Sequence, residues 1–167
     1  SIERHMGRLE RAESRRSEAL AIALDRKLRT QEGYVLAARA LDRLAAGSLD
    51  EADAAAAAAL AIGRELAHVR ITFQAHCVQV RTAALRGERR AVARLIRTVT
   101  RLNLRVLRFH DRIQMHLDFG ECYLQIGRPA EAAREARAGL GMALPGGYCE
   151  QGWQLHLLHA EALEGQG

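Results

Sequence analysis

The sequence contains few aromatic residues, two prolines and a single lysine. Aromatic residues occupy 4% of the 167 positions, whereas apolar residues of all kinds occupy 49%. This balance favours helices, and the many alanines allow those helices to approach one another closely. The basic residues are arginines apart from Lys27, and the formal net charge of +5 says little by itself about partners.

Cysteine is also scarce. The three cysteines, Cys77, Cys122 and Cys149, are an odd number and lack the spacing of metal ligands. A reduced compartment is therefore the simpler interpretation, and no disulfide framework is indicated.

Long apolar runs are absent as well. No run reaches the roughly 18 apolar residues that a membrane-spanning helix needs, and the first residues lack a signal-peptide pattern. We therefore expect a cytoplasmic protein without a membrane partner. Residues 1–6 (SIERHM) precede the first repeat and are either an expression scar or native sequence, so the fold argument begins at residue 7.

The sequence shows no catalytic arrangement. Its glycines are spread along the chain and do not cluster as they do in a phosphate-binding loop. His110 and Asp111 are adjacent, but a cysteine–histidine nucleophile needs a spatial contact that the cysteine spacings do not predict. We expect no enzymatic activity, no cofactor and no bound metal.

A repeat of 40 residues is the dominant pattern. Five glycines stand 40 residues apart, at Gly7, Gly47, Gly87, Gly127 and Gly167. The residues after them are similar: GRLERAESRRSEALAIA, GSLDEADAAAAAALAIG and GRPAEAAREARAGLGMA, with GERRAVARLIRTVTRLN the most divergent. A period of about 20 to 50 residues is typical of a solenoid, in which each unit contacts its neighbours. The sequence therefore predicts a single all-α repeat domain over residues 7–167.

Each period is predicted to contain two helices, separated by the repeat glycine. In the second full unit the first helix is expected over residues 49–62, ending at Gly63 in the left-handed conformation. Asn103 holds the equivalent position one period later. The second helix is expected over residues 65–86.

The second helix of each unit carries an apolar face. Spacings of four, three and four place Phe73, Cys77, Val80 and Ala84 on one side of this helix. The same places are held by Ile113, Leu117, Gly120 and Leu124 one period later, and then by Trp153, Leu157 and Ala160. The closest helix contacts are expected at small residues, namely Ala40, Val80, Gly120 and Ala160.

The repeat resembles the tetratricopeptide repeat. In GECYLQIGRPAEAAREA, the places of that family's small and aromatic residues are held by Gly120, Tyr123, Gly127, Ala132 and Ala136. The family's usual unit has about 34 residues, and the longer unit here is similar to the superhelical repeats of MalT-type bacterial transcriptional regulators. The resemblance implies a right-handed superhelical solenoid of antiparallel helix pairs. It also implies that the chain is a fragment of a larger protein, whose ATPase module and LuxR-type DNA-binding domain flank the repeats.

A Gln-x-His pattern recurs with the same period. Its three copies are Gln74 with His76, Gln114 with His116, and Gln154 with His156. Equivalent positions on stacked helices lie about 8 to 10 Å apart, too far for two histidines to share one metal ion. The histidines are therefore either half-buried and hydrogen-bonded between paired helices, or next to a functional groove that the glutamines line.

The second helices are predicted to line this groove. Gln114, Leu117 and Glu121 share one helical face, as do the matching residues one period before and after. By the resemblance, this face maps to the concave surface of tetratricopeptide proteins. The candidate groove residues are Tyr34, Gln74, Arg81, Gln114, Glu121, Gln154 and Glu161. They suit a polar ligand or an extended peptide, and equally a solvated face.

Arginines form a second pattern. Residues 81–112 hold ten arginines, and four of them follow helical spacing, at Arg90, Arg94, Arg97 and Arg101. Four apolar residues on the opposite side are expected to face the core: Val92, Leu95, Val99 and Leu102. The arginine stripe is interpreted as a solvated face, a contact with an acidic domain, or a nucleic-acid contact. Nucleic acid is the least favoured of the three, because interleaved aromatic residues and a helix-turn-helix are both missing.

We therefore expect a binding and regulatory module within a larger bacterial transcriptional regulator. In the leading hypothesis, the groove captures a small polar effector or a peptide and relays its occupancy to other domains of the parent protein. The alternative is a protein–protein scaffold without a small effector.

Overall fold

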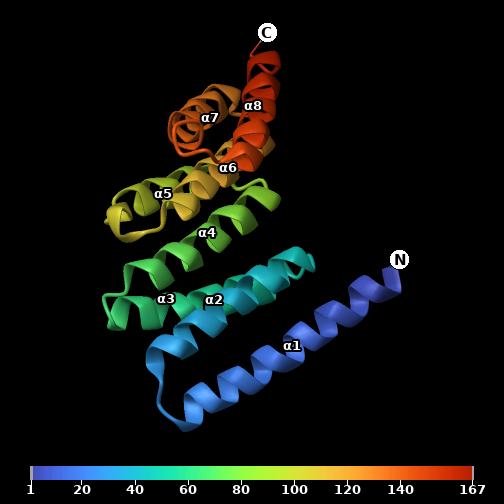
Figure 1. Ribbon diagram of the computed structural model, residues 1–167, viewed down its shortest axis with the longest axis vertical. Helices are drawn as coiled ribbons and strands as arrows, with labels where there is room; N and C mark the ends of the chain where they lie inside the picture. Colours follow the sequence, from blue (N-terminus) through green and yellow to red (C-terminus); the bar gives the residue numbers. More distant parts are fainter. Residues whose placement is uncertain (1, 167) are drawn as a thin grey trace. The chain divides into compact units, whose positions relative to one another are not determined.

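Eight α-helices and one short 3₁₀ helix make up the part of the chain that the structure describes (Figure 1). The structure is a computed structural model that describes the backbone of residues 2–166 and the side chains of residues 11 and 13–166. The helices are α1 (Ile2–Asp25), α2 (Arg29–Ala45), α3 (Leu49–Glu65), α4 (Val69–Leu85), α5 (Arg89–Thr100), η1 (Leu104–Val106), α6 (Phe109–Gln125), α7 (Pro129–Ala143) and α8 (Cys149–Glu164). No strand occurs among these residues, so the predicted all-α class is confirmed.

The same turn follows most helices, at even intervals along the chain. Helices α2 to α8 begin at residues 29, 49, 69, 89, 109, 129 and 149. The backbone takes a positive φ between helices at Lys27, Gly47, Ala67, Gly87, Gly127 and Gly147. In each turn the next amide bonds to the carbonyl five residues earlier, as in Ser48 N to Arg43 O at 2.9 Å. This bond closes the helix end in a Schellman motif, so each period of the sequence consists of two helix-and-turn segments of equal length.

Two of the predicted repeat glycines do not mark a described turn. Helix α1 runs without interruption from Ile2 to Asp25, so it passes through Gly7 and includes residues 2–6. A glycine inside a helix is tolerated at a cost of about 1 kcal/mol relative to alanine. Gly167 lies outside the described residues.

The prediction that Gly63 ends its helix is wrong. Helix α3 continues to Glu65, and the left-handed residue after it is Ala67, with a φ of 48°. Gly63 lies buried inside α3, where a Cβ atom would stand 2.9 Å from the backbone nitrogen of Thr72. This glycine therefore serves the close approach of α3 and α4, and α4 begins at Val69 and not at residue 65.

The repeating turn is interrupted between α5 and α6. Helix α5 ends at Thr100, and the chain then forms η1. Leu107, which stands where the left-handed residue would be, is extended with φ −80° and ψ 150°. Asn103 lies beyond the end of α5, but its φ of −72° is not left-handed. Residues 101–108 are therefore the place where the regular spacing of turns is broken.

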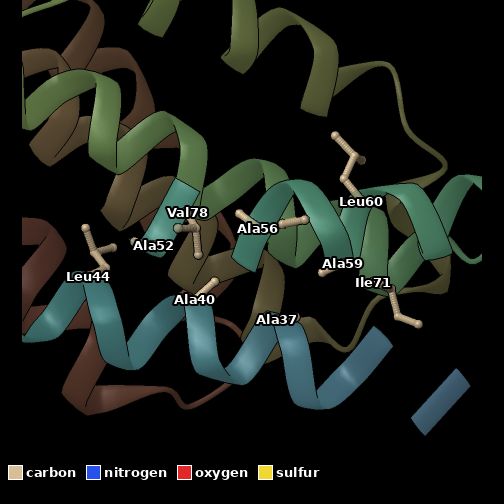
Figure 2. Packing of buried hydrophobic residues seen from close by; sticks show 10 residues of the cluster. Ala37, Ala40, Leu44, Ala52, Ala56, Ala59, Leu60, Ile71 and Val78 are labelled. Carbon is tan, nitrogen blue, oxygen red and sulfur yellow. The ribbon is translucent and has the colours of Figure 1, made fainter. Parts of the chain in front are cut away.

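Contacts divide the chain into two compact units, Ser1–Val78 and Gln79–Gly167, with the boundary inside α4. In the first unit α1 packs on α2, and α2 packs on α3. The core of this unit is built largely from alanine (Figure 2). Its buried residues are Ala37, Ala40, Leu44, Ala52, Ala56, Ala59, Leu60, Ile71, Ala75 and Val78.

The second unit has larger core side chains. Here α5 packs on α6, α6 on α7, and α7 on α8, while α6 also contacts α8. The core residues are Ile113, Leu117, Ala136, Leu140, Ala143, Leu155 and Leu158. Glycines make room for the leucines of α8: Gly120 lies against Leu158, and a Cβ atom on Gly139 would stand 2.7 Å from Leu155 Cδ2. The close contact predicted at Gly120 is confirmed.

The predicted apolar face of the second helices is present on α4 and α6. Its buried members are Phe73, Cys77, Val80, Ala84, Ile113, Leu117 and Gly120, and Leu124 is half-buried. On α8 the matching residues are exposed, with Trp153 58% and Leu157 51% accessible. No described helix follows α8 to cover them. Among the small residues, Ala40 and Val80 are fully buried, whereas the close contact predicted at Ala160 is wrong because this residue is exposed.

Candidate functional site

Four charged side chains from three helices gather in the second unit. Arg81 comes from α4, Asp118 and Glu121 come from α6, and Glu161 comes from α8. The charges of Asp118, Arg81 and Glu161 all act on the carboxyl group of Glu121. We call these four residues the mixed-charge cluster. The structure thus brings together Arg81, Glu121 and Glu161, three of the residues that the sequence predicted to line a groove.

Asp118 is the member of the cluster that the sequence analysis missed. Gln114, one helical turn earlier on α6, donates a hydrogen bond from Nε2 to Asp118 Oδ1 at 2.9 Å. Burial raises the pKa of Asp118, while the bond from Gln114 and the charge of Arg81 act in the opposite direction. The equivalent positions one period away hold Val78 and Leu158, which are both buried. Because these equivalents are apolar, a comparison of the repeats did not point to Asp118. Its i, i+4 spacing from Gln114 could have indicated it.

Glu121 carries the second perturbed carboxyl group. Burial raises its pKa, and the negative charges of Asp118 and Glu161 raise it further, whereas Arg81 lowers it. The neighbouring Cys122 is buried, which raises the pKa of its thiol to about 12. That thiol is protonated at neutral pH and is therefore a poor nucleophile. The charged groups of the cluster can bind a ligand of complementary charge.

The remaining predicted groove residues are Tyr34 on α2, Gln74 on α4 and Gln154 on α8. Tyr34 and Gln74 belong to the first unit. The Tyr34 hydroxyl lies 3.5 Å from His68 Nε2, and the Arg70 guanidinium lies 6.0 Å from the centre of the tyrosine ring. Gln74 on α4 and Gln154 on α8 are half-buried.

The three histidines of the Gln-x-His pattern have different surroundings. His76 is buried, at 4% exposure. His116 is half-buried, and its Nδ1 lies 2.8 Å from Glu135 Oε2 on α7. His156 is exposed. The prediction of a half-buried, hydrogen-bonded histidine between paired helices is therefore correct for His116 and wrong for His156. The three histidines are not equivalent in their surroundings.

A hollow of about 490 Å³ lies where the regular turn is broken. Its lining residues come from residues 100–105 and from α6 and α7: Thr100, Leu102, Asn103, Leu104, Arg105, Arg112, Met115, His116 and Met142. Arg112 Nη2 donates to Met142 Sδ at 3.8 Å, and its guanidinium lies 5.3 Å from the centre of the Phe109 ring. We call this the repeat-break hollow. It combines apolar walls with a positioned cation.

A larger hollow of about 910 Å³ lies against the outer face of α5. It is lined by Gly87, Glu88, Arg89, Arg90, Ala91, Ala93, Arg94, Arg97 and Arg128, and we call it the arginine hollow. The four arginines of the predicted stripe, Arg90, Arg94, Arg97 and Arg101, are all exposed. On the opposite side Val92 and Val99 are buried as predicted, whereas Leu95 and Leu102 are half-buried. The structure therefore adds Arg89 and Arg128 to the stripe and leaves Arg101 outside the hollow.

Metal-ligand clusters and membrane-spanning helices are both absent from the described residues. Within the described part of the chain, no three histidine, cysteine, aspartate or glutamate side chains are arranged to hold a metal ion. None of the described helices combines the length and the apolar character that crossing a bilayer requires.

Comparison with known proteins gives no relative: no protein-family profile, curated protein or solved structure matches this chain. The resemblance to tetratricopeptide repeats and to MalT-type regulators therefore stays a prediction.

Proposed function

We propose that this chain is a non-catalytic binding module that holds a basic peptide segment on the mixed-charge cluster. The observation that supports this proposal is the grouping of Asp118, Arg81 and Glu161 near the carboxyl group of Glu121, which brings together three carboxylates and one guanidinium. Such a group has more negative than positive charge, and a lysine or arginine side chain of a partner complements it.

The surroundings of the carboxylates explain why a cation is favoured. Burial raises the pKa values of Asp118 and Glu121, because the folded chain has removed part of the water that would solvate their charges. A bound ammonium or guanidinium group supplies charge-assisted hydrogen bonds in place of that water. Binding should therefore lower both pKa values.

The cluster also supports a regulatory role. Its members stand on α4, α6 and α8, so a bound peptide favours the arrangement of helices in which all three can reach it. In this proposal the helix pairs form a right-handed, tetratricopeptide-like superhelix inside a larger bacterial transcriptional regulator. When a peptide occupies the cluster, the repeat domain then favours one arrangement of its helices, and neighbouring domains respond to that arrangement.

Fluorescence anisotropy with a labelled ten-residue peptide, in which three lysines alternate with glycine and serine, tests the proposal. We expect the double variant Asp118→Asn, Glu121→Gln to raise the Kd by about 10-fold, because two charge-assisted contacts are lost. The matched control is Glu150→Gln, Glu164→Gln, which removes two exposed carboxylates on α8 and should change the Kd by less than about twofold. Equal effects of the two changes would refute a specific site.

A second candidate function is the capture of a small polar effector in the repeat-break hollow. Its volume of about 490 Å³ is within the range of small-molecule pockets, about 300 to 1,000 Å³, and Arg112 is positioned there by a ring and a sulfur atom. A thermal-shift screen of sugars, nucleotides and amino acids tests it. A true effector should raise the Tm of the wild type but not of Leu104→Trp, which fills the hollow. The scaffold alternative predicts that the chain binds a peptide and that none of these compounds raises the Tm of the wild type.

A further inference from the structure

We infer that the arginine hollow is a docking site for an acidic, partly apolar segment of a partner protein. The hollow lies on α5 and at the start of α7, and none of its lining residues belongs to the mixed-charge cluster. The inference is therefore independent of the peptide-binding function proposed above and concerns a partner of the opposite charge.

The first argument is that three arginines of the hollow, Arg90, Arg94 and Arg97, have no ion-pair partner among the described residues. Arg128 differs, because it pairs with Glu131 on the first turn of α7. Like charges three and four residues apart on a helix repel one another. An anionic partner would relieve this repulsion.

The second argument concerns the floor of the hollow. Ala91 and Ala93 line it between the arginines, and both are half-buried. The aliphatic stems of the arginine side chains add to this apolar surface. A partner that fits both features must carry apolar side chains among its acidic ones. A polyphosphate would complement the charge of the arginines but has no apolar groups to contact the alanines.

The third argument is the spacing of the guanidinium groups. Arg90, Arg94 and Arg97 are four and three residues apart on a helix of 12 residues, which has a length of about 18 Å. Acidic residues at the same spacing on a partner helix would lie at matching intervals. Arginine forms bidentate bonds with carboxylates, which gives such a contact orientation as well as charge.

Nucleic acid is a poorer match to the same surface. No aromatic side chain lines the hollow, so the base stacking that single strands use is missing. The lining also offers no asparagine or glutamine amide for a base edge.

Fluorescence anisotropy in 150 mM NaCl with a labelled 16-residue helical peptide tests the inference. The peptide carries glutamates three and four residues apart, with leucines between them. Competitors are the same peptide with serine in place of leucine, a 12-base-pair DNA duplex, and tripolyphosphate. We expect the leucine peptide to bind at least about threefold more tightly than the serine peptide, because the alanine floor contacts its leucines.

Charge-reversal variants locate the site. Arg94→Glu with Arg97→Glu should weaken binding of the leucine peptide by about 10-fold. The matched control is Arg64→Glu with Arg137→Glu, which changes the net charge equally at exposed positions outside the hollow. It should have less than about a twofold effect. Ala93→Phe should weaken binding of the leucine peptide but not of tripolyphosphate, and circular dichroism checks that each variant is folded.

Three results would overturn the inference. The first is equal weakening by both double variants, which would show binding to net charge alone. The second is tighter binding of the duplex than of the peptide, lost in the Arg94→Glu, Arg97→Glu variant, which would make the hollow a nucleic-acid site. The third is no binding of the leucine peptide.

Discussion

Several arginines of the first unit pair with carboxylates of other helices, whereas those of α5 in the second unit do not pair with any described carboxylate. In the first unit, Arg29 pairs with Glu32 and Glu65, Arg43 pairs with Glu13 and Glu51, and Arg16 pairs with Asp42. In the second unit, the exposed arginines of α5 meet no carboxylate among the described residues. Apart from Arg29–Glu32, which lies within α2, the pairs of the first unit join neighbouring helices, whereas Arg90, Arg94 and Arg97 of α5 remain available to a partner.

Their cores differ as well. The first unit buries mainly alanines between helices, and the second buries mainly leucines, two of which, Leu155 and Leu158, fit against glycines. Both kinds of core are compatible with the same repeating helix-and-turn segment. The turn therefore sets the geometry, and the sequence of each unit is free to vary in packing and in charge. The following predictions test this comparison, from the largest expected effect to the smallest.

Truncating the leucine core should give the largest effect. Leu155 is fully buried and lies against Gly139. Leu155→Ala should reduce the free energy of unfolding by about 2 to 5 kcal/mol, because it removes buried methyl groups and leaves a cavity. Urea unfolding monitored by circular dichroism measures this change. Leu157→Ala, at an exposed position two residues later, should cost less than about 0.5 kcal/mol, and comparable losses would contradict the packing described for α8.

Enlarging the alanine core should give the next largest effect. Ala56 is fully buried in α3, whereas the next residue, Ala57, is exposed. Ala56→Leu should destabilise the chain by about 1 to 3 kcal/mol, because the closely packed helices cannot admit the larger side chain. Ala57→Leu serves as the control and should be almost neutral. If Ala56→Leu were neutral too, the first unit would be loosely packed.

The mixed-charge cluster should make stability depend on pH. Burial raises the pKa of Asp118 in the folded chain above its ordinary value of 3.8, so folding favours the protonated carboxyl group. That contribution is fully present below pH 3.8 and is lost as the pH rises through the raised value. Asp118→Asn keeps an acceptor for Gln114 and removes the titration. The variant should therefore be more stable than the wild type at neutral pH, by about 0.5 to 1 kcal/mol.

Urea unfolding of both proteins between pH 3 and pH 8 provides the measurement. The difference between variant and wild type should shrink as the pH falls toward 3.8. A difference that stays constant across this range would show that Asp118 is solvated like an ordinary surface carboxylate.

Exchanging residues in the turns should give the smallest effect. Ala67 takes a φ of 48°, a conformation in which a Cβ atom is strained, whereas Gly87 takes a φ of 72° in the turn that follows α4. Ala67→Gly should stabilise the chain by about 0.5 to 1 kcal/mol, and Gly87→Ala should destabilise it by a similar amount. Thermal unfolding compares the two. Shifts of the same sign would mean that the two turns are not equivalent.

The regular part of the fold could be predicted from the sequence. Gly47, Gly87 and Gly127 mark turns because a left-handed residue is most easily supplied by glycine. The division of each period into two equal halves was harder to see, because Lys27 and Ala67 take the same conformation without being glycine. Gly63 was misassigned for the related reason that a glycine needed for close packing looks the same in sequence as one needed for a turn.

The candidate site could be predicted only in part. Arg81, Glu121 and Glu161 were found because they recur at the repeat period, whereas Asp118 has apolar equivalents in the neighbouring repeats. The arginine stripe was visible from helical spacing. Its hollow also depends on Arg128, which comes from the start of α7 and is close to α5 only in the folded chain. The broken turn at residues 101–108 follows no rule that sequence patterns supply.

The even spacing of the helices has a consequence for folding. Since α2 to α8 begin at equal intervals along the chain, a helix of the folding chain could dock in the wrong order, displaced by one or two segments, if the segments between looped out. Glycine contacts oppose such a shift, because Gly63 accommodates Thr72 and Gly139 accommodates Leu155, and a displaced helix would bring a different side chain to each gap. The irregular segment at residues 101–108 interrupts the repeating turn. The native order of helices therefore differs from a displaced order in the position of this segment.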